Sequence, residues 1–167
     1  MAIQNFENKT FEPNLEMKYT AYTRREFSAG SGARLVNDLG EADLILKGQI
    51  VAVIVPALAF TQSQTFESRA TVWVEATVED VKTRKVVWRQ SSRGSSEFFV
   101  TTDLQFNRVL QARALEQAGM MIATDLAVRF HAYLESVAQA MPPGSAPTGT
   151  EIPPLKPPLP SEQPATK

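Results

Sequence analysis

The amino-acid sequence predicts an α+β domain, a two-layer sandwich with two helices packed on one face of a mixed β-sheet of four or five strands. Two observations lead to this prediction. Residues 69–80 alternate apolar and polar side chains, as a strand with one buried face does. Two longer segments, residues 14–28 and 103–139, repeat apolar residues at helical spacing. The predicted order of elements is β-α-β-β-β-(β)-α. In this arrangement the apolar stripe of each helix packs on the apolar face of the sheet.

A short strand, a helix and a second short strand are predicted at the start of the chain. Residues 2–6 are the first strand candidate. The helix pattern spans residues 14–28, and Gly30 follows it as a helix stop. Residues 33–37 are the second strand candidate. Since a helix connects these two strands, they would lie parallel if they are neighbours.

The central part of the chain is predicted to form antiparallel strands. Residues 69–80 and 86–89 are expected to form a hairpin, because the polar segment Lys82–Lys85 between them is typical of a turn. A further extended segment is expected around residues 97–100. Residues 44–55 form the preceding strand. Its side chains expected to face the core are Leu44, Leu46, Ile50 and Ile54.

The longest element is predicted to be a helix that begins after Thr102 or Asp103 and runs to about Gln139. Several alanines together with Gly119 keep this helix thin, so that it can approach a sheet closely. Its expected apolar stripe consists of Phe106, Leu110, Leu115, Ile122, Leu126, Phe130, Leu134 and Val137.

The end of the chain differs sharply in composition from the rest. Nine of the 11 prolines follow Met141, and this segment has no periodic apolar pattern. We therefore expect residues 1–140 to form one domain and residues 141–167 to form a disordered, proline-rich tail. Its PPLKPPLP stretch resembles a ligand of SH3 domains, although such a composition is more often only a solvated tail.

The composition argues against several functional classes. The net charge is −1, with 17 basic and 18 acidic residues, so the chain has no general attraction for nucleic acid. No cysteine is present, and His131 is the single histidine, so the sequence predicts neither a metal site nor a cofactor. No nucleotide-binding or hydrolase motif occurs. The sequence therefore predicts a binding protein and not an enzyme.

One positive feature is a local excess of basic residues around the predicted hairpin. On neighbouring strands such side chains could converge on an anionic ligand such as a phosphate. An ordinary solvated face, in which Lys and Arg protect the sheet from edge pairing, explains them equally simply. The candidate ligand-binding residues are Arg69, Lys82, Arg84, Lys85, Arg89 and Arg93.

A second feature is the presence of apolar side chains where solvent is expected. Trp73 falls on the polar face of its strand, and Leu58 and Phe60 lie in the loop formed by residues 56–67. If the helices cover only one face, these three residues are candidates for contact with a partner. Alternatively, Trp73 pairs with Trp88 across the hairpin, and the loop folds back on the domain.

Several segments, taken in order, resemble the family of the lipopolysaccharide-assembly lipoprotein LptE. Each motif is loose when taken alone, and the resemblance, over residues 2–138, rests on their order and spacing. The segments are Ile3–Thr10 followed by Glu12-Pro13, the strand entry Glu41–Ile50, the hairpin end Val86-Val87-Trp88 and the closing alanine-rich helix.

The resemblance implies an outer-membrane lipoprotein on the periplasmic side that plugs the β-barrel LptD, helps it fold and binds lipopolysaccharide. The family is anchored by an acylated N-terminal cysteine. Because this sequence has no cysteine, a soluble form without leader and lipid anchor is expected. The runner-up interpretation is a periplasmic lipoprotein adaptor that uses the same fold in another envelope complex.

Overall fold

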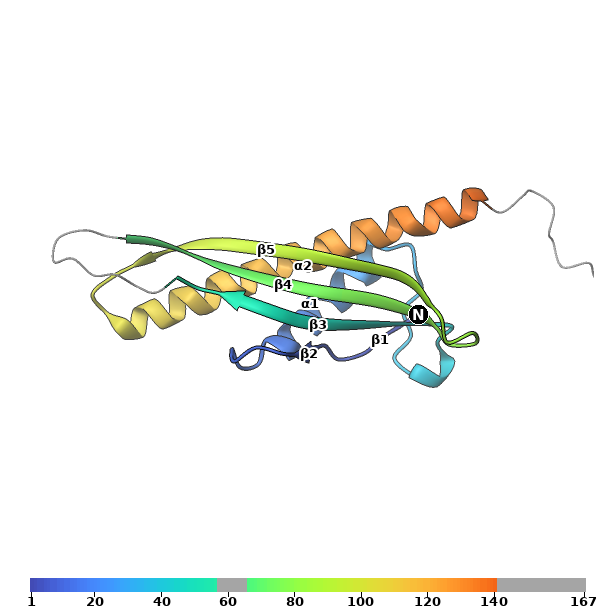
Figure 1. The fold of residues 1–167 in the computed structure, drawn as a ribbon, viewed down its shortest axis with the longest axis horizontal. Coiled ribbons are helices and arrows are strands. Elements are labelled where there is room, and N and C mark those ends of the chain that lie inside the picture. Colours follow the sequence, from blue (N-terminus) through green and yellow to red (C-terminus); the bar gives the residue numbers. More distant parts are fainter. Residues whose placement is uncertain (57–65, 141–167) are drawn as a thin grey trace, which may run out of the picture.

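Two helices lie on one face of a mixed β-sheet in the computed structural model, which describes residues 1–56 and 66–140 (Figure 1). The sheet order is β1-β3-β4-β5, and β2 also pairs with β3. β1 and β2 run parallel to β3, whereas the other pairs are antiparallel. The predicted fold class is therefore confirmed. The elements are β1 (Ala2–Ile3), β2 (Glu7–Asn8), α1 (Leu15–Gly30), a 3-10 turn (Leu39–Glu41), β3 (Leu44–Ile54), β4 (Phe66–Asp80), β5 (Val86–Val100) and α2 (Leu104–Ala140).

The hairpin of β4 and β5 contains the two longest strands of the sheet. The two strands pair from Phe66 opposite Val100 to Glu79 opposite Val86. At about 3.3 Å per residue, 15 residues span about 50 Å. The predicted segments 86–89 and 97–100 are thus two ends of one strand. The serine- and glycine-rich stretch between them carries no apolar alternation, but pairing with β4 keeps it extended.

The predicted strand at residues 33–37 is absent from the sheet. This segment is held instead by the first residue of the chain, because the Val36 N–H donates to the carbonyl of Met1 at 2.9 Å. The charged amino terminus of Met1 donates to the Arg34 carbonyl at 2.8 Å. The parallel neighbour of β1 is β3, so the predicted pairing was wrong in its partner, although a parallel pair does exist.

A β-bulge at Val51 changes which side chains of β3 face the core. The register with β4 shifts between Ile50 and Ala52. One extra residue moves all later side chains to the opposite face of the sheet. Ile54, predicted to face the core, is consequently 55% exposed, whereas Val53 packs against the core.

The core lies between the sheet and α2. On β4 the inner face consists of Ala70, Val72, Val74, Ala76 and Val78, all fully buried as predicted. α2 contributes Leu115, Ile122, Leu126 and Phe130, also as predicted. Phe106 and Val137, at the two ends of the predicted stripe, are exposed. With 37 residues the helix is about 55 Å long and crosses the strands obliquely, so its ends extend beyond the packed interface (Figure 1).

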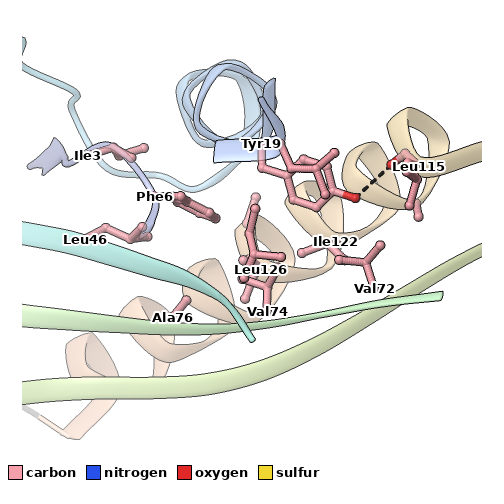
Figure 2. Packing of buried hydrophobic residues seen from close by; sticks show 14 of the residues in the cluster. Ile3, Phe6, Tyr19, Leu46, Val72, Val74, Ala76, Leu115, Ile122 and Leu126 are labelled. Atoms are coloured by element: carbon pink, nitrogen blue, oxygen red, sulfur yellow. Dashed lines mark hydrogen bonds between the residues drawn. The ribbon is translucent and has the colours of Figure 1, made fainter. Parts of the chain in front are cut away.

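Close packing of the layers depends on two glycines. Figure 2 shows the hydroxyl of Tyr19 of α1 donating to the Leu115 carbonyl of α2, at 2.8 Å. The Tyr19 ring lies directly over Gly119, where a Cβ atom would overlap it. On the other side of α2, the carbonyl of Ala118 sits against Gly94 of β5. α2 is thus held tightly between α1 and β5.

Candidate functional site

Among residues 1–56 and 66–140, no helix lies on the outer face of the sheet. Both helices lie on the opposite side (Figure 1), and odd-numbered residues of β4 and β5 point away from them. This face is mostly polar, with a few apolar side chains among them, so we call it the open face. Its members include Lys47, Gln49, Ala52 and Ile54 of β3, Arg69, Thr71, Trp73, Glu75, Thr77 and Glu79 of β4, and Arg89, Ser91, Arg93, Ser95, Glu97 and Phe99 of β5.

Trp73 lies in the middle of the open face. It is half-buried, with Ala52 opposite it on β3 and Arg93 opposite it on β5. The alternative pairing with Trp88 is wrong, because Trp88 lies opposite Val78 on the inner face. There its ring packs edge-on against Phe130 of α2. An amphipathic aromatic ring on an uncovered sheet face is a suitable contact for a partner protein.

Arg69 is already engaged within the sheet. Its guanidinium forms an ion pair with Glu97, directly opposite on β5. Hydrogen bonding from Arg69, reinforced by its charge, holds the pKa of Glu97 below the ordinary value. Since the charge of Arg69 is balanced by this neighbour, it is the weakest of the six basic candidates for binding an external anion.

Lys82, Arg84 and Lys85 lie together in the turn between β4 and β5, which we call the basic turn. Asp80 shapes this turn by accepting hydrogen bonds from the backbone N–H and the hydroxyl of Thr83, at 2.7 and 2.9 Å. These bonds lower the pKa of Asp80. The backbone of Arg84 adopts a left-handed conformation with φ of 55°. Lys82 is 3.3 Å from the carboxylate of Asp43, and both side chains are highly exposed.

Arg89 and Arg93 form a third group on the open face of β5. Both are exposed, and neither makes an ion pair with any residue that the structure describes. They are four residues apart on one strand face, about 13 Å. Ser91 lies between them on the same face.

The six predicted basic residues therefore do not form one cluster. From Arg69 to Asp80, where the basic turn begins, the strand extends over about 36 Å. Arg89 pairs with Thr77, which places it about 10 Å from the start of the turn. Arg69 is therefore too far from the basic turn to share an anionic group with it, whereas Arg89 lies closer to the turn than to Arg93.

The predicted loop contacts Leu58 and Phe60 lie outside the described residues. The adjoining end of the domain nevertheless exposes several large apolar side chains. They include Ile54 at the end of β3, Phe99 near the end of β5, and Leu104, Phe106 and Val109 in the first turns of α2. Phe99 and Leu104 are each 62% exposed. The helical spacing of apolar residues predicted that Phe106 lies in the core. This spacing does not indicate where α2 extends past the sheet, so the prediction was wrong for Phe106.

His131, Ser92 and Asp125 each make a contact within the domain. His131 lies 3.4 Å from Glu135 on the surface of α2. The buried hydroxyl of Ser92 donates to Asp125 at 2.6 Å, and Asp125 also accepts from Arg129. Within residues 1–56 and 66–140 no three metal-binding side chains gather. None of the helices in this part of the chain is both long and apolar enough to cross a membrane.

Comparison with known proteins provides the family. A family model described as LptE, lipopolysaccharide-assembly, matches residues 1–134. No curated protein matches the chain in sequence.

Several solved structures share the fold at low sequence identity. Protein XCC0632 from Xanthomonas campestris superposes with a TM-score of 0.57 at 12% identity, over 83% of this chain and 87% of that one. The PelC dodecamer from Paraburkholderia phytofirmans gives 0.54 at 14% identity, over 74% and 82%. A candidate lipoprotein from Caulobacter crescentus gives 0.53 at 13% identity, over 78% and 91%.

Proposed function

Because the chain belongs to the LptE lipopolysaccharide-assembly family, we propose that it is a non-enzymatic subunit of the outer-membrane complex that assembles lipopolysaccharide. It acts there on the periplasmic side, as the plug and folding partner of an LptD-type β-barrel, and it binds lipopolysaccharide. The observation that carries this proposal is the family match over residues 1–134, which spans all elements of the fold except the end of α2.

The open face supports the role of a plug. The interior wall of a large membrane barrel is polar, and the open face offers it a mixture of charged, hydroxyl and amide side chains around Trp73. A two-layer domain is too thick for a barrel of about eight strands, whose interior is filled by side chains. It requires a lumen of the size found in barrels of about 20 strands or more.

The proposal is tested by producing the chain together with its cognate barrel protein and purifying the barrel. The expected result is a stable complex in equal amounts, which persists when the barrel is extracted in detergent. Trp73→Ala should weaken the complex, whereas Thr77→Ala, a smaller change on the same face, should not. Failure of the unmodified chain to associate with the barrel would contradict the plug role.

Lipopolysaccharide contact is proposed for the basic turn. Lys82, Arg84 and Lys85 stand at the end of the hairpin, where a phosphate can approach without entering the sheet. Arg84→Glu combined with Lys85→Glu should reduce binding of purified lipopolysaccharide, and the loss should be larger at low salt. Lys9→Glu, a charge change remote in sequence, serves as the control. Equal binding by the turn variant and the control would remove the turn from the site.

A second candidate function is that of an adaptor in another envelope complex. The shared fold of the Caulobacter lipoprotein and of PelC supports it, because the same architecture occurs in proteins with other names. Affinity purification of the chain from its own cell envelope separates the two functions. Recovery of a barrel protein supports the first, and recovery of a different complex without a barrel supports the second.

A further inference from the structure

One edge of the sheet has no strand beside it within the part of the chain that the structure describes. β5 is the last strand in the order β1-β3-β4-β5, and it is 15 residues long. Among the residues that the structure describes, no strand pairs with the edge of β5 that faces away from β4. The opposite edge of the sheet is covered differently, because the short strands β1 and β2 both pair with β3.

The hydrogen-bond pattern identifies which backbone groups of β5 lie at this edge. The backbone of Leu46 and Ile50 faces β1 and β2, since their carbonyls accept from Gln4 and Lys9. Successive residues of a strand direct their N–H and C=O groups to opposite sides. The backbone of Gln49, between these two residues, therefore faces β4.

The same alternation continues across β4. Gln49 pairs with Glu75, so the backbone of Glu75 faces β3 and that of its neighbour Val74 faces β5. Val74 pairs with Ser92, and the even-numbered residues of β5 therefore bond to β4. The odd-numbered residues, including Ser91, present their N–H and C=O groups at the free edge. In agreement, the Ser91 carbonyl accepts a hydrogen bond from a side chain, the amide of Gln90, at 3.1 Å.

α2 provides an apolar shelf beneath this edge. The bond from Ser92 to Asp125 shows which side of α2 lies under β5. Met121 and Val128 precede and follow Asp125 by four and three residues, so they lie on the same side of the helix. Their side chains are 51% and 62% exposed. α1 cannot cover them, because it packs on the opposite side of α2, over Gly119.

The free edge of β5 carries positive charge from two arginines. The side chains of Arg89 and Arg93 are exposed on the open face, and they have no ion-pair partner among the described residues. The backbone groups of the same two residues lie at the free edge. A strand added beside β5 would place its own residues directly opposite these arginines, about 5.5 Å away between Cα atoms. Carboxylates at those two positions would complete the ion pairs.

We propose that the free edge of β5 binds an extended segment of another protein by strand addition. The segment alternates apolar residues, which rest on Met121 and Val128, with polar residues that include two carboxylates four positions apart, opposite Arg89 and Arg93. This surface is separate from the basic turn, and the proposal does not depend on the barrel or on lipopolysaccharide. Strand addition supplies affinity through the main chain and specificity through alternate side chains.

Two other occupants fit less well. A second copy paired symmetrically through β5 would bring two α2 helices into the same space, because the helix lies directly beneath the strand, with Ala118 against Gly94. The segment 141–167 of the same chain contains nine prolines. Proline has no N–H group to donate, so this segment is poorly suited to complete a ladder.

Hydrogen exchange tests the premise in the free protein. The amides of Ser91, Arg93 and Ser95 should exchange rapidly, whereas those of Gln90 and Ser92 should be protected by β4. The probe is a short synthetic peptide in which valine alternates with threonine and two glutamates stand four positions apart. On addition of this peptide, the three odd-numbered amides should become protected by about tenfold or more.

Binding of the labelled peptide is then measured by fluorescence anisotropy against two pairs of variants. Ser91→Pro removes an edge N–H that β4 does not use, so the fold should persist while affinity falls at least about tenfold. Ser91→Ala retains the N–H and should bind normally. Met121→Lys should weaken binding, whereas Met120→Lys, one position around the helix, should have little effect. Circular dichroism verifies that each variant is folded.

The charge rule has its own control. A peptide with lysines in place of the glutamates should bind weakly to the unmodified chain and tightly to the double variant Arg89→Glu with Arg93→Glu. The proposal is overturned if the glutamate peptide does not bind, if Ser91→Pro binds as Ser91→Ala does, or if both peptides bind equally. Dimers in sedimentation that Ser91→Pro dissociates would also overturn it, because the occupant would then be a second copy. Loss of the barrel complex in the earlier test leaves these outcomes unchanged.

Discussion

Replacing Gly94 with alanine should destabilise the domain, because the added methyl group would collide with α2. A Cβ atom at this position would overlap the backbone carbonyl of Ala118 and lie 3.0 Å from Cγ1 of Ile122. The carbonyl belongs to the middle of a helix, so it cannot rotate away as a flexible side chain could. α2 would therefore have to withdraw from β5 by about 1 Å or more.

The expected loss can be assembled from two contributions. Overfilling a packed interface costs about 1–3 kcal/mol. Withdrawal of the helix would also stretch the partly buried hydrogen bond from Ser92 to the carboxylate of Asp125, now 2.6 Å long. A hydrogen bond to a charged group is worth about 1.5–3 kcal/mol. A total near 3–4 kcal/mol would lower the Tm of a domain of this size by about 10 °C.

The measurement is urea and thermal unfolding followed by circular dichroism. Gly30→Ala is the matched control, because nothing lies within 4 Å of the position that its Cβ would take. Gly30 ends α1, where alanine is a better helix former, so the control should melt at or slightly above the temperature of the unmodified chain. A Gly94→Ala variant that melted within about 2 °C of the unmodified chain would refute the close approach of α2 to β5.

Four further outcomes are expected. Burial raises the pKa of Tyr19, so the free energy of unfolding should stay constant below about pH 10 and fall above it. The variant Tyr19→Phe should be about 1 kcal/mol less stable at neutral pH. In urea titrations at rising pH it should show much less of the alkaline loss of stability. The pKa of Glu97 is lowered by Arg69 from 4.5, so this pair stabilises the fold above that pH and ceases to do so as the pH falls. Glu97→Gln should therefore reduce the loss of unfolding free energy at acidic pH. The reduction should be small, because the pair is exposed. Trp73→Ala should leave the Tm nearly unchanged and reduce the yield of the barrel complex. Removing residues 141–167 should leave the Tm unchanged, and a large drop would show that the tail packs on the domain.

The buried face of the sheet was predictable because local sequence determines it. The alternation in residues 69–80 identified the inner face of β4, and helical spacing identified the central part of α2. The errors arose where a distant contact decides the conformation. Residues 33–37 form no strand of the sheet, and the backbone of Arg34 and Val36 bonds to Met1 instead. Ile54 turned outward because of a bulge at Val51, and a bulge leaves no periodic signal.

The candidate site was predictable in residue type but not in grouping. Basic residues within 25 positions of one another appeared to converge, yet two long strands carry them far apart. The pairing of Arg69 with Glu97 depends on the hairpin register, which the composition of the turn alone does not specify. The position of Trp88 on the inner face follows from the same register.

The alternation of backbone groups along β5 has a consequence for how the family can diverge. Even-numbered residues such as Ser92 and Gly94 hold the strand to β4 and α2, so a substitution there acts on folding. Odd-numbered residues such as Arg89 and Arg93 contribute little to the core. Stability and the choice of partner thus depend on alternate residues of the same strand. A lineage could change the segment that it recognises by substituting only the odd-numbered residues, without passing through an unstable variant.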